Sequence, residues 1–81
     1  MIRITLYGRA DCTLCDEMHA VVEAVARDVP LALEMIDVDG DPALVAAYGM
    51  DVPVLHVNGR EAFRHRVGEA ALRARLAREP G

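Results

Sequence analysis

Two cysteines three positions apart, in the segment Cys12-Thr13-Leu14-Cys15, are the residues of this sequence best suited to chemistry. They fall where a short apolar strand gives way to an amphipathic helix, so unpaired backbone N–H groups and the helix dipole favour a thiolate at Cys12. Cys15 lies one turn further along, and we expect it to be more buried and less reactive. This asymmetry suits thiol-disulfide exchange, in which Cys12 forms a mixed disulfide and Cys15 attacks Cys12 to release the product.

Other roles for the pair are a disulfide staple, a zinc site and a redox-inert domain that binds a protein partner through its hairpin face. The staple is disfavoured, because closing so short a loop contributes only about 2 kcal/mol and cytosolic reductants would keep it open. The zinc alternative rests on the pattern CxxCxxxH formed by Cys12, Cys15 and His19. Structural zinc requires four ligands, and the fourth would have to be His56, His65 or Asp16.

Length and composition indicate one globular domain over residues 1–81. The chain has 81 residues, of which 53% are hydrophobic and 27% charged, and it contains no Ser, Lys, Gln or Trp. Serine hydrolysis, lysine Schiff bases and the Walker lysine are therefore excluded. The apolar runs are too short for a membrane span and the first residues lack the layout of a signal peptide, so we expect a soluble cytoplasmic protein.

The charge of the chain is unevenly distributed. The net charge is −4 at pH 7, which argues against nucleic acid as a partner. Six of the nine arginines stand within residues 60–78, where Arg64, His65 and Arg66 form a basic cluster. This cluster is either a solvated strand end or a site for an anionic ligand. Asp11 and Asp16 flank the cysteines, and their negative charge opposes thiolate formation.

Hydrophobic periodicity predicts alternating strands and helices. We expect strands over residues 2–7 and 31–38, helices over 12–28, 42–48 and 69–78, and a hairpin of strands 54–57 and 60–64. Asp41 is the predicted N-cap of the second helix, and Asn58-Gly59 is a strong signal for the two-residue hairpin turn. The order βαβαββα predicts an α/β fold with one four-stranded mixed sheet and helices on both faces.

Taken together, these residues resemble the glutaredoxin-like proteins of the thioredoxin superfamily. The resemblance rests on the strand Ile4–Tyr7, on Cys12-Thr13-Leu14-Cys15-Asp16, on Asp51-Val52-Pro53-Val54, and on the hairpin and final helix that follow. It covers the chain from Ile2 to about Leu76 and implies a thioredoxin-like fold with thiol-disulfide oxidoreductase activity. It also implies that Pro53 is cis and lies against the cysteine pair, which leaves the backbone of Val52 free to pair with a substrate strand or with glutathione.

The sequence departs from glutaredoxins at positions that bear on the ligand. Thr13-Leu14 replaces the usual Pro-Tyr, the segment 64–68 replaces a Gly-Gly, and Arg9 is the nearest cation where those proteins carry a lysine before the first cysteine. We therefore expect Arg64 and Arg66, with Arg9, to hold an anionic group of the substrate, and Tyr7 to line the edge of the site. The expected partner of this monomer is a protein disulfide or glutathione, the latter as a co-substrate, with no bound metal or organic cofactor.

Overall fold

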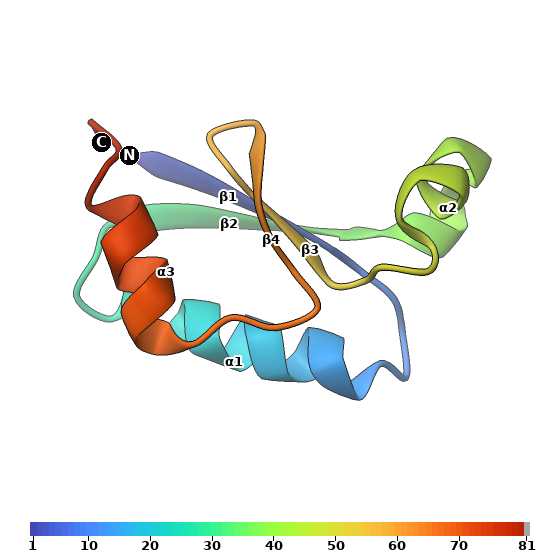
Figure 1. Cartoon of the computed structure of the whole chain (residues 1–81), viewed down its shortest axis with the longest axis horizontal. Helices are drawn as coiled ribbons and strands as arrows, with labels where there is room; N and C mark the ends of the chain where they lie inside the picture. The colour runs from blue at the N-terminus through green and yellow to red at the C-terminus, as the bar shows by residue number, and fades with distance from the viewer. Residues whose placement is uncertain (81) are drawn as a thin grey trace.

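The computed structural model describes residues 1–80, whose strands and helices follow the predicted order βαβαββα (Figure 1). The elements are β1 (Ile2–Gly8), α1 (Thr13–Ala26), β2 (Leu31–Asp37), the 3-10 turn η1 (Val38–Gly40), α2 (Pro42–Tyr48), β3 (Val54–Val57), β4 (Arg60–Arg64) and α3 (Glu69–Leu76). The first and last helices end two residues earlier than predicted, and Val38 belongs to η1 rather than to β2. Asp37 causes this last change, because its carboxylate accepts a hydrogen bond from the Asp39 N–H at 2.9 Å and so caps the turn.

The sheet is mixed, as predicted, with the strand order β2-β1-β3-β4. β1 is parallel to β2, with Ile2 opposite Leu31 and Leu6 opposite Met35. It is antiparallel to β3, and β3 forms the predicted hairpin with β4. Because both β1 and β2 run toward η1 and the start of α1, the end of the sheet at Gly8 is the end where the cysteines stand.

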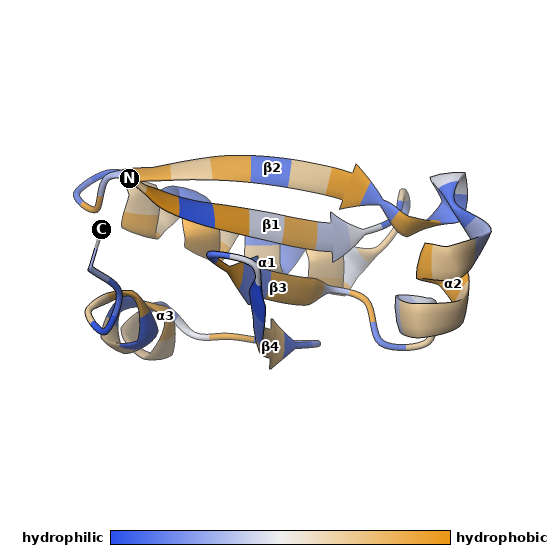
Figure 2. Cartoon of the chain, turned by 90° about the horizontal axis from the view of Figure 1, so that it is seen from above, coloured by the Kyte–Doolittle hydropathy of each residue, from blue (hydrophilic) through white to orange (hydrophobic). Residues whose placement is uncertain are grey.

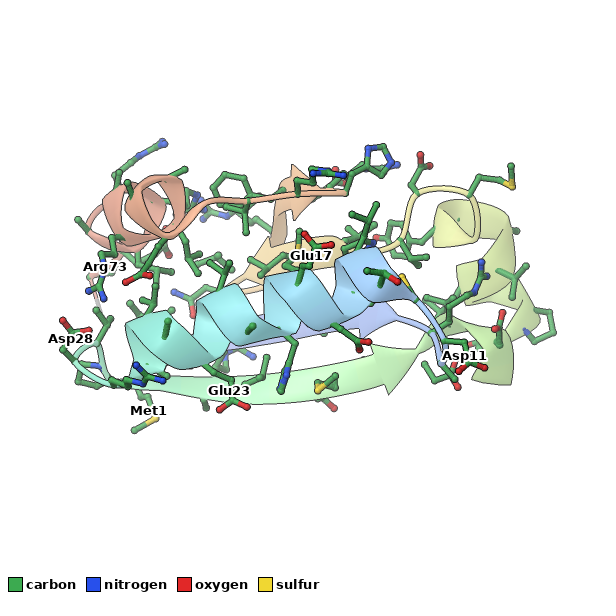
Figure 3. All side chains as sticks on the ribbon, turned by 90° about the horizontal axis from the view of Figure 1, so that it is seen from below. Met1, Asp11, Glu17, Glu23, Asp28 and Arg73 are labelled. Carbon is green, nitrogen blue, oxygen red and sulfur yellow. A yellow bond between two sulfur atoms is a disulfide. The ribbon has the colours of Figure 1, made fainter. Side chains whose placement is uncertain are left out.

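One face of the sheet carries the core of the protein. Ile2, Ile4 and Leu6 of β1 are buried on this face, while Arg3 and Thr5 between them point the other way, and Figure 2 shows the resulting bands of hydropathy along β1. α1 and α3 both pack here, through the buried residues Met18, Val22, Val25, Leu72 and Leu76. Arg73 joins the two helices, since it donates to Asp28 after α1 at 2.9 Å and to Glu69 of its own helix, and Figure 3 shows it reaching toward Asp28.

The opposite face of the sheet differs from the expectation that helices cover both faces. In the part of the chain that the structure describes, no helix lies over it (Figure 2). α2 has seven residues, buries none of them, and sits beyond the end of the sheet (Figure 1). It reaches this face only through Tyr48, whose ring lies 5.0 Å from that of Tyr7 and 5.8 Å from that of His56.

The hairpin turn also ties the two ends of the chain to the sheet. Asn58 and Gly59 both have positive φ, 49° and 84°, as a two-residue turn of this type requires. The side chain of Asn58 accepts a hydrogen bond from the Arg3 N–H at 2.9 Å and donates one to Glu79 at 2.7 Å. Arg75 donates to the other carboxylate oxygen of Glu79 at 2.6 Å, so Glu79 is held from two sides. These contacts, first that of Arg75 and then that of Asn58, lower the pKa of Glu79 below its ordinary range.

We predict that Glu79 contributes stability that disappears in acid. Its folded-state pKa is lowered, so the contribution is complete above the ordinary glutamate pKa of about 4.3 and is lost as the pH falls through the folded-state value. The free energies of unfolding of the parent protein and of Glu79→Gln, measured with denaturant, should therefore differ most at neutral pH and converge below about pH 4. Glu34→Gln is the control, since Glu34 is exposed and forms no ion pair within residues 1–80. If the difference in free energy of unfolding between the parent protein and Glu79→Gln stays constant on acidification, this linkage is wrong.

Candidate functional site

Cys12 and Cys15 form a disulfide at the start of α1, with their Cα atoms 5.2 Å apart. Cys12 is the N-cap residue, and its Sγ accepts a hydrogen bond from the Cys15 N–H at 3.1 Å, the position in which a cap oxygen usually stands. Cys15 is only 5% exposed, whereas Cys12 is half-buried. The structure thus shows the difference in exposure that the sequence predicts for the two sulfurs.

The turn before the helix brings Cys15 against the end of β1. Asp11 adopts a left-handed conformation with φ 55°, which redirects the chain from the strand into the helix. At Gly8 the two elements come so close that a Cβ atom there would lie 3.1 Å from the Sγ of Cys15. Glycine at the last position of β1 therefore lets Cys15 approach the strand more closely than a residue with a Cβ atom would.

The segment before β3 lies at this same end of the sheet. Val54 pairs with Tyr7 in the antiparallel register of β1 and β3, so Pro53 falls at the level of Gly8, against which Cys15 packs. Pro53 is buried, and the peptide bond that joins it to Val52 is cis. Within residues 1–80, neither the N–H nor the C=O of Val52 forms a hydrogen bond, which leaves this backbone free to pair with another chain.

A network of charged side chains holds the Val52–Pro53 segment from both ends. Asp51 accepts hydrogen bonds from Arg64 at 2.8 Å and from the ring of His65 at 3.3 Å, when that ring carries its proton on Nε2. The N–H of His65, a residue with φ 68°, donates to the C=O of Pro53 at 2.8 Å. Arg64 also donates to both carboxylate oxygens of Glu61, which lowers the pKa of Glu61 and raises the pKa of Arg64. The network links the start of β3 to the end of β4.

Three of the residues that the sequence suggests for substrate binding are engaged within the chain. Arg9 donates to Asp39 at 3.0 Å and to the C=O of Gly49 at 2.9 Å, so it links the segment after β1 to η1 and to the end of α2. Arg64 is bound to Asp51 and Glu61. Tyr7 lies on the face of the sheet away from α1, where its ring packs against Tyr48 and His56. Substrate binding by these three residues stays a prediction, and a ligand would have to displace the partners of both arginines.

Arg66 differs from the other two arginines of this set. Among the residues that the structure describes, it forms no ion pair. It lines a surface hollow of about 280 Å³ together with Leu14, which stands between the two cysteines, with Glu17 of α1 and with Gly68 before α3. Arg66 is therefore the cation of the basic cluster that is free to meet an anion next to the disulfide.

The aromatic and imidazole cluster of Tyr7, Tyr48 and His56 is a feature that sequence reasoning misses. The Tyr48 hydroxyl and the Nε2 of His56 lie 3.2 Å apart, and the guanidinium of Arg64 lies 5.6 Å from the centre of the Tyr48 ring. Tyr7, Tyr48 and His56 come from β1, α2 and β3, and no local sequence signal places a helix residue against these two strands. The cluster attaches α2 to the sheet and bears on the site only through Arg64.

The structure gives no support to the zinc alternative. In residues 1–80 no group of three His, Cys, Asp or Glu side chains is arranged to hold a metal ion. The ring of His19 pairs instead with Glu23 at 3.3 Å, one turn further along α1.

The helices within residues 1–80 lack the combination of length and apolar character that a membrane-spanning helix requires.

A four-stranded mixed sheet in the order βαβαββα, with a CxxC disulfide where the first helix begins, defines a thioredoxin-like fold. Solved structures agree: a mutant thioredoxin from Halobacterium salinarum is 32% identical, with a TM-score of 0.63 over 93% of this chain and 71% of that one. The chain belongs to the family described as glutaredoxin-like domain (DUF836), whose model matches residues 3–77. Both the predicted family and the predicted fold are thereby confirmed.

Relatives of similar length accompany this match. A structural-genomics target protein from X. campestris is 41% identical and superposes with a TM-score of 0.80, covering 95% of this chain and 99% of that one. A protein from Nitrosomonas europaea is 29% identical with a TM-score of 0.79, covering 91% and 89%. An uncharacterized protein of Mycobacterium tuberculosis is 32% identical over 94% of this chain and 84% of its own. A glutaredoxin-like domain with a CxxC disulfide is consistent with a role in thiol-disulfide redox chemistry.

We predict that a methyl group at position 8 disturbs the packing of Cys15 against the end of β1. Gly8→Ala should cost about 1–3 kcal/mol of stability in the oxidised protein, because the new Cβ must push Cys15 or the start of α1 aside. The control is Gly40→Ala, where the added Cβ would meet nothing within 4 Å and stability should stay within about 1 kcal/mol of the parent. Denaturant unfolding under non-reducing conditions measures both. Equal stability of the two variants would show that Cys15 accommodates the methyl group.

Proposed function

We propose that this chain is a small thiol-disulfide oxidoreductase in which Cys12 is the nucleophile and Cys15 the resolving thiol. The observation that carries the proposal is the unequal exposure of the two sulfurs at the start of α1, where Cys12 is half-buried and Cys15 is 5% exposed. Membership in the glutaredoxin-like family supports the same chemistry.

The reaction takes place in two exchanges. The Cys12 thiolate attacks one sulfur of a substrate disulfide, forms a mixed disulfide with it, and expels the other substrate sulfur as a thiolate. The Cys15 thiolate then attacks the Sγ of Cys12, closes the Cys12–Cys15 disulfide and releases the second substrate thiolate. Two electrons pass from the protein to the substrate, and a low-molecular-weight thiol or a protein dithiol returns them to the Cys12–Cys15 pair. The same steps in reverse oxidise a dithiol.

The start of α1 supplies the electrostatic help that the first exchange requires. In the oxidised protein the Cys15 N–H already points at the Sγ of Cys12 at 3.1 Å. The same hydrogen bond, together with the positive end of the helix dipole, stabilises the negative sulfur when the disulfide is open. The acidic neighbours Asp11 and Asp16 oppose this effect, and both are exposed, so solvent screens their charge.

Two features next to the sulfurs are suited to hold a substrate. The free N–H and C=O of Val52 offer backbone hydrogen bonds to an extended peptide or to glutathione, as the family resemblance implies, and Pro53 fixes this segment at the level of Gly8. Arg66, in the hollow beside Leu14, offers a guanidinium fork to a carboxylate. Substrates are therefore protein disulfides or glutathione mixed disulfides, and glutathione acts as a co-substrate rather than a resident cofactor.

The two thiols should behave differently when either is replaced. Cys15→Ser retains Cys12, the more exposed of the two sulfurs, and loses the resolving sulfur, so it should accumulate a mixed disulfide after incubation with a disulfide substrate. Cys12→Ser should not, because the remaining sulfur is buried. Mass spectrometry under non-reducing conditions reports the adduct in each case. If both thiols of the reduced parent protein react with iodoacetamide at equal rates from about pH 5 to about pH 9, the assignment of roles is wrong.

Variants of Arg64 and Arg66 should distinguish binding of an anionic substrate from positioning of the Val52–Pro53 segment. Arg66→Ala should raise KM for a glutathione mixed disulfide about tenfold and leave the reduction of a small neutral disulfide unchanged, because it removes one charge-assisted contact. Arg64→Ala should instead lower turnover of both substrates, because it frees Asp51 and loosens the Val52–Pro53 segment.

Arg27→Ala is the matched control for the two arginine variants. Arg27 is an exposed arginine beyond the end of α1 that forms no ion pair within the described chain, so its loss changes only the net charge. Unchanged KM and kcat/KM for the glutathione substrate in both Arg64→Ala and Arg66→Ala would exclude an arginine clamp and favour a protein partner.

A further inference from the structure

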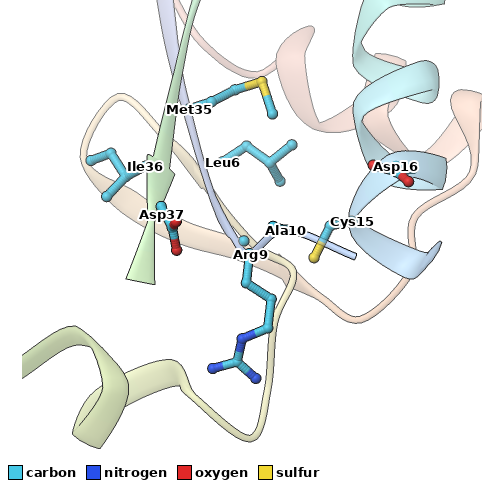
Figure 4. Close-up of a pocket in the computed structure, with 9 residues that line it drawn as sticks. Leu6, Arg9, Ala10, Cys15, Asp16, Met35, Ile36 and Asp37 are labelled. Atoms are coloured by element: carbon cyan, nitrogen blue, oxygen red, sulfur yellow. The ribbon is translucent and has the colours of Figure 1, made fainter. Parts of the chain in front are cut away.

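A hollow of about 350 Å³ opens beside Cys15 on the side of α1 that faces β2 (Figure 4). Its apolar lining includes Leu6, Cys15 and Met35, and Figure 4 shows the Leu6 and Met35 side chains on the same side of the strands as α1. The hollow of Arg66 involves the β4–α3 connection instead, so the two lie on opposite sides of the helix. The substrate contacts proposed above make no use of the hollow beside β2.

Met35 is exposed although it stands on the core side of the sheet. It pairs in register with Leu6, which is buried, so the two side chains leave the sheet on the same face. Leu31 and Leu33, earlier on the same side of β2, pack against the core. Met35 is nevertheless 59% exposed on this edge strand, and α1 contributes the charged Asp16 as well as Cys15 to the hollow. A large apolar side chain is thus left uncovered on an edge strand next to the redox disulfide.

The unpaired charges that line this hollow are negative. Asp16 and Asp37 line the hollow, and in the described part of the chain neither forms an ion pair. The one cation that lines it, Arg9, binds Asp39 and the C=O of Gly49, and Figure 4 shows its guanidinium turned away from Cys15. An apolar surface with unneutralised carboxylates at its edge is complementary to an apolar side chain that has a cationic neighbour.

We propose that this hollow selects protein substrates in which an apolar side chain flanked by Lys or Arg lies close to the target disulfide. The apolar side chain covers Leu6 and Met35, and the basic neighbour faces Asp16 and Asp37. The inference rests on the proposed oxidoreductase function and names the class of substrate for it. Glutathione has two carboxylates and no large apolar group, so it does not use this side of the helix.

The test compares three disulfides as substrates of the reduced protein in single-turnover reactions. Two are matched peptides with the same disulfide and the same leucine beside it, one with arginines around that leucine and one with glutamates. The third is bis(2-hydroxyethyl) disulfide, a small neutral reference that reports intrinsic thiol reactivity. We expect the basic peptide to react about tenfold faster than the acidic one at low salt, and the ratio to approach one at about 1 M salt, where the Debye length is about 3 Å.

Variants locate the preference on the hollow. Asp16→Asn and Asp37→Asn should each lower the basic-to-acidic ratio about threefold, and Asn at position 37 still provides the oxygen that caps η1. Glu34→Gln is the matched control, because it removes one carboxylate from the same strand β2 at a position outside the hollow and should leave the ratio unchanged. Met35→Ala should slow both peptides relative to the neutral disulfide, and Met35→Leu should restore them.

The outcomes separate failure of the inference from failure of the proposed function. If none of the three disulfides is reduced, the oxidoreductase function itself is wrong. If all are reduced, and the ratio is near one or falls equally in Glu34→Gln and in the two aspartate variants, the hollow selects nothing and only the net charge acts. If Met35→Ala affects the peptides and the neutral disulfide alike, the apolar part of the proposal is overturned.

Discussion

The close approach of Cys15 to Gly8 is the constraint on which the rest of the site depends. It fixes the first turn of α1 against the end of β1, buries the second sulfur, and leaves the first at the helix cap, where the Cys15 N–H is its hydrogen-bond donor. The antiparallel register of β1 and β3 then brings Pro53 to the level of Gly8. The disulfide and the Val52–Pro53 segment, whose backbone is free, therefore lie at the same end of the sheet. The unequal exposure of the two cysteines therefore follows from how the first turn of α1 packs against the end of β1.

The open face of the sheet explains why so many charged contacts surround this end of the molecule. α2 buries no residue and contacts the open face of the sheet through Tyr48, so it has no apolar core of its own to hold it in place. Arg9 and the cluster of Tyr7, Tyr48 and His56 hold it there instead, and the Asp51 network does the same for the segment that follows. The arginines that look available from the sequence are thus largely engaged in positioning the segments around the disulfide.

Local signals in the sequence predict most of the fold and the centre of the site. Asp41 caps α2 and Asn58-Gly59 forms the hairpin turn as expected, because cap and turn preferences depend on a few neighbouring residues. The engagement of Arg9 with Asp39 and Gly49 and of Arg64 with Asp51 could not be predicted, since these contacts join residues 13 to 40 positions apart. The position of α2 beyond the end of the sheet could not be predicted for the same reason, because the sequence pattern of a helix indicates its length but not the surface on which it packs.

The two hollows beside α1 give the disulfide different charged surroundings. On the side of the β4–α3 connection Arg66 stands next to Leu14, together with the carboxylate of Glu17, and on the β2 side the unpaired charges are Asp16 and Asp37, next to Leu6 and Met35. In the proposed reaction, a substrate whose disulfide meets Cys12 finds an available cation on one side only, and an apolar surface edged by carboxylates on the other. Such an arrangement favours one orientation of an asymmetric peptide over its reverse, because the reversed peptide would move its acidic group from Arg66 to Asp16 and Asp37. Since the sulfur attacked by Cys12 must be the one nearest the cap, orientation decides which half of the substrate is carried on the protein and which half leaves first.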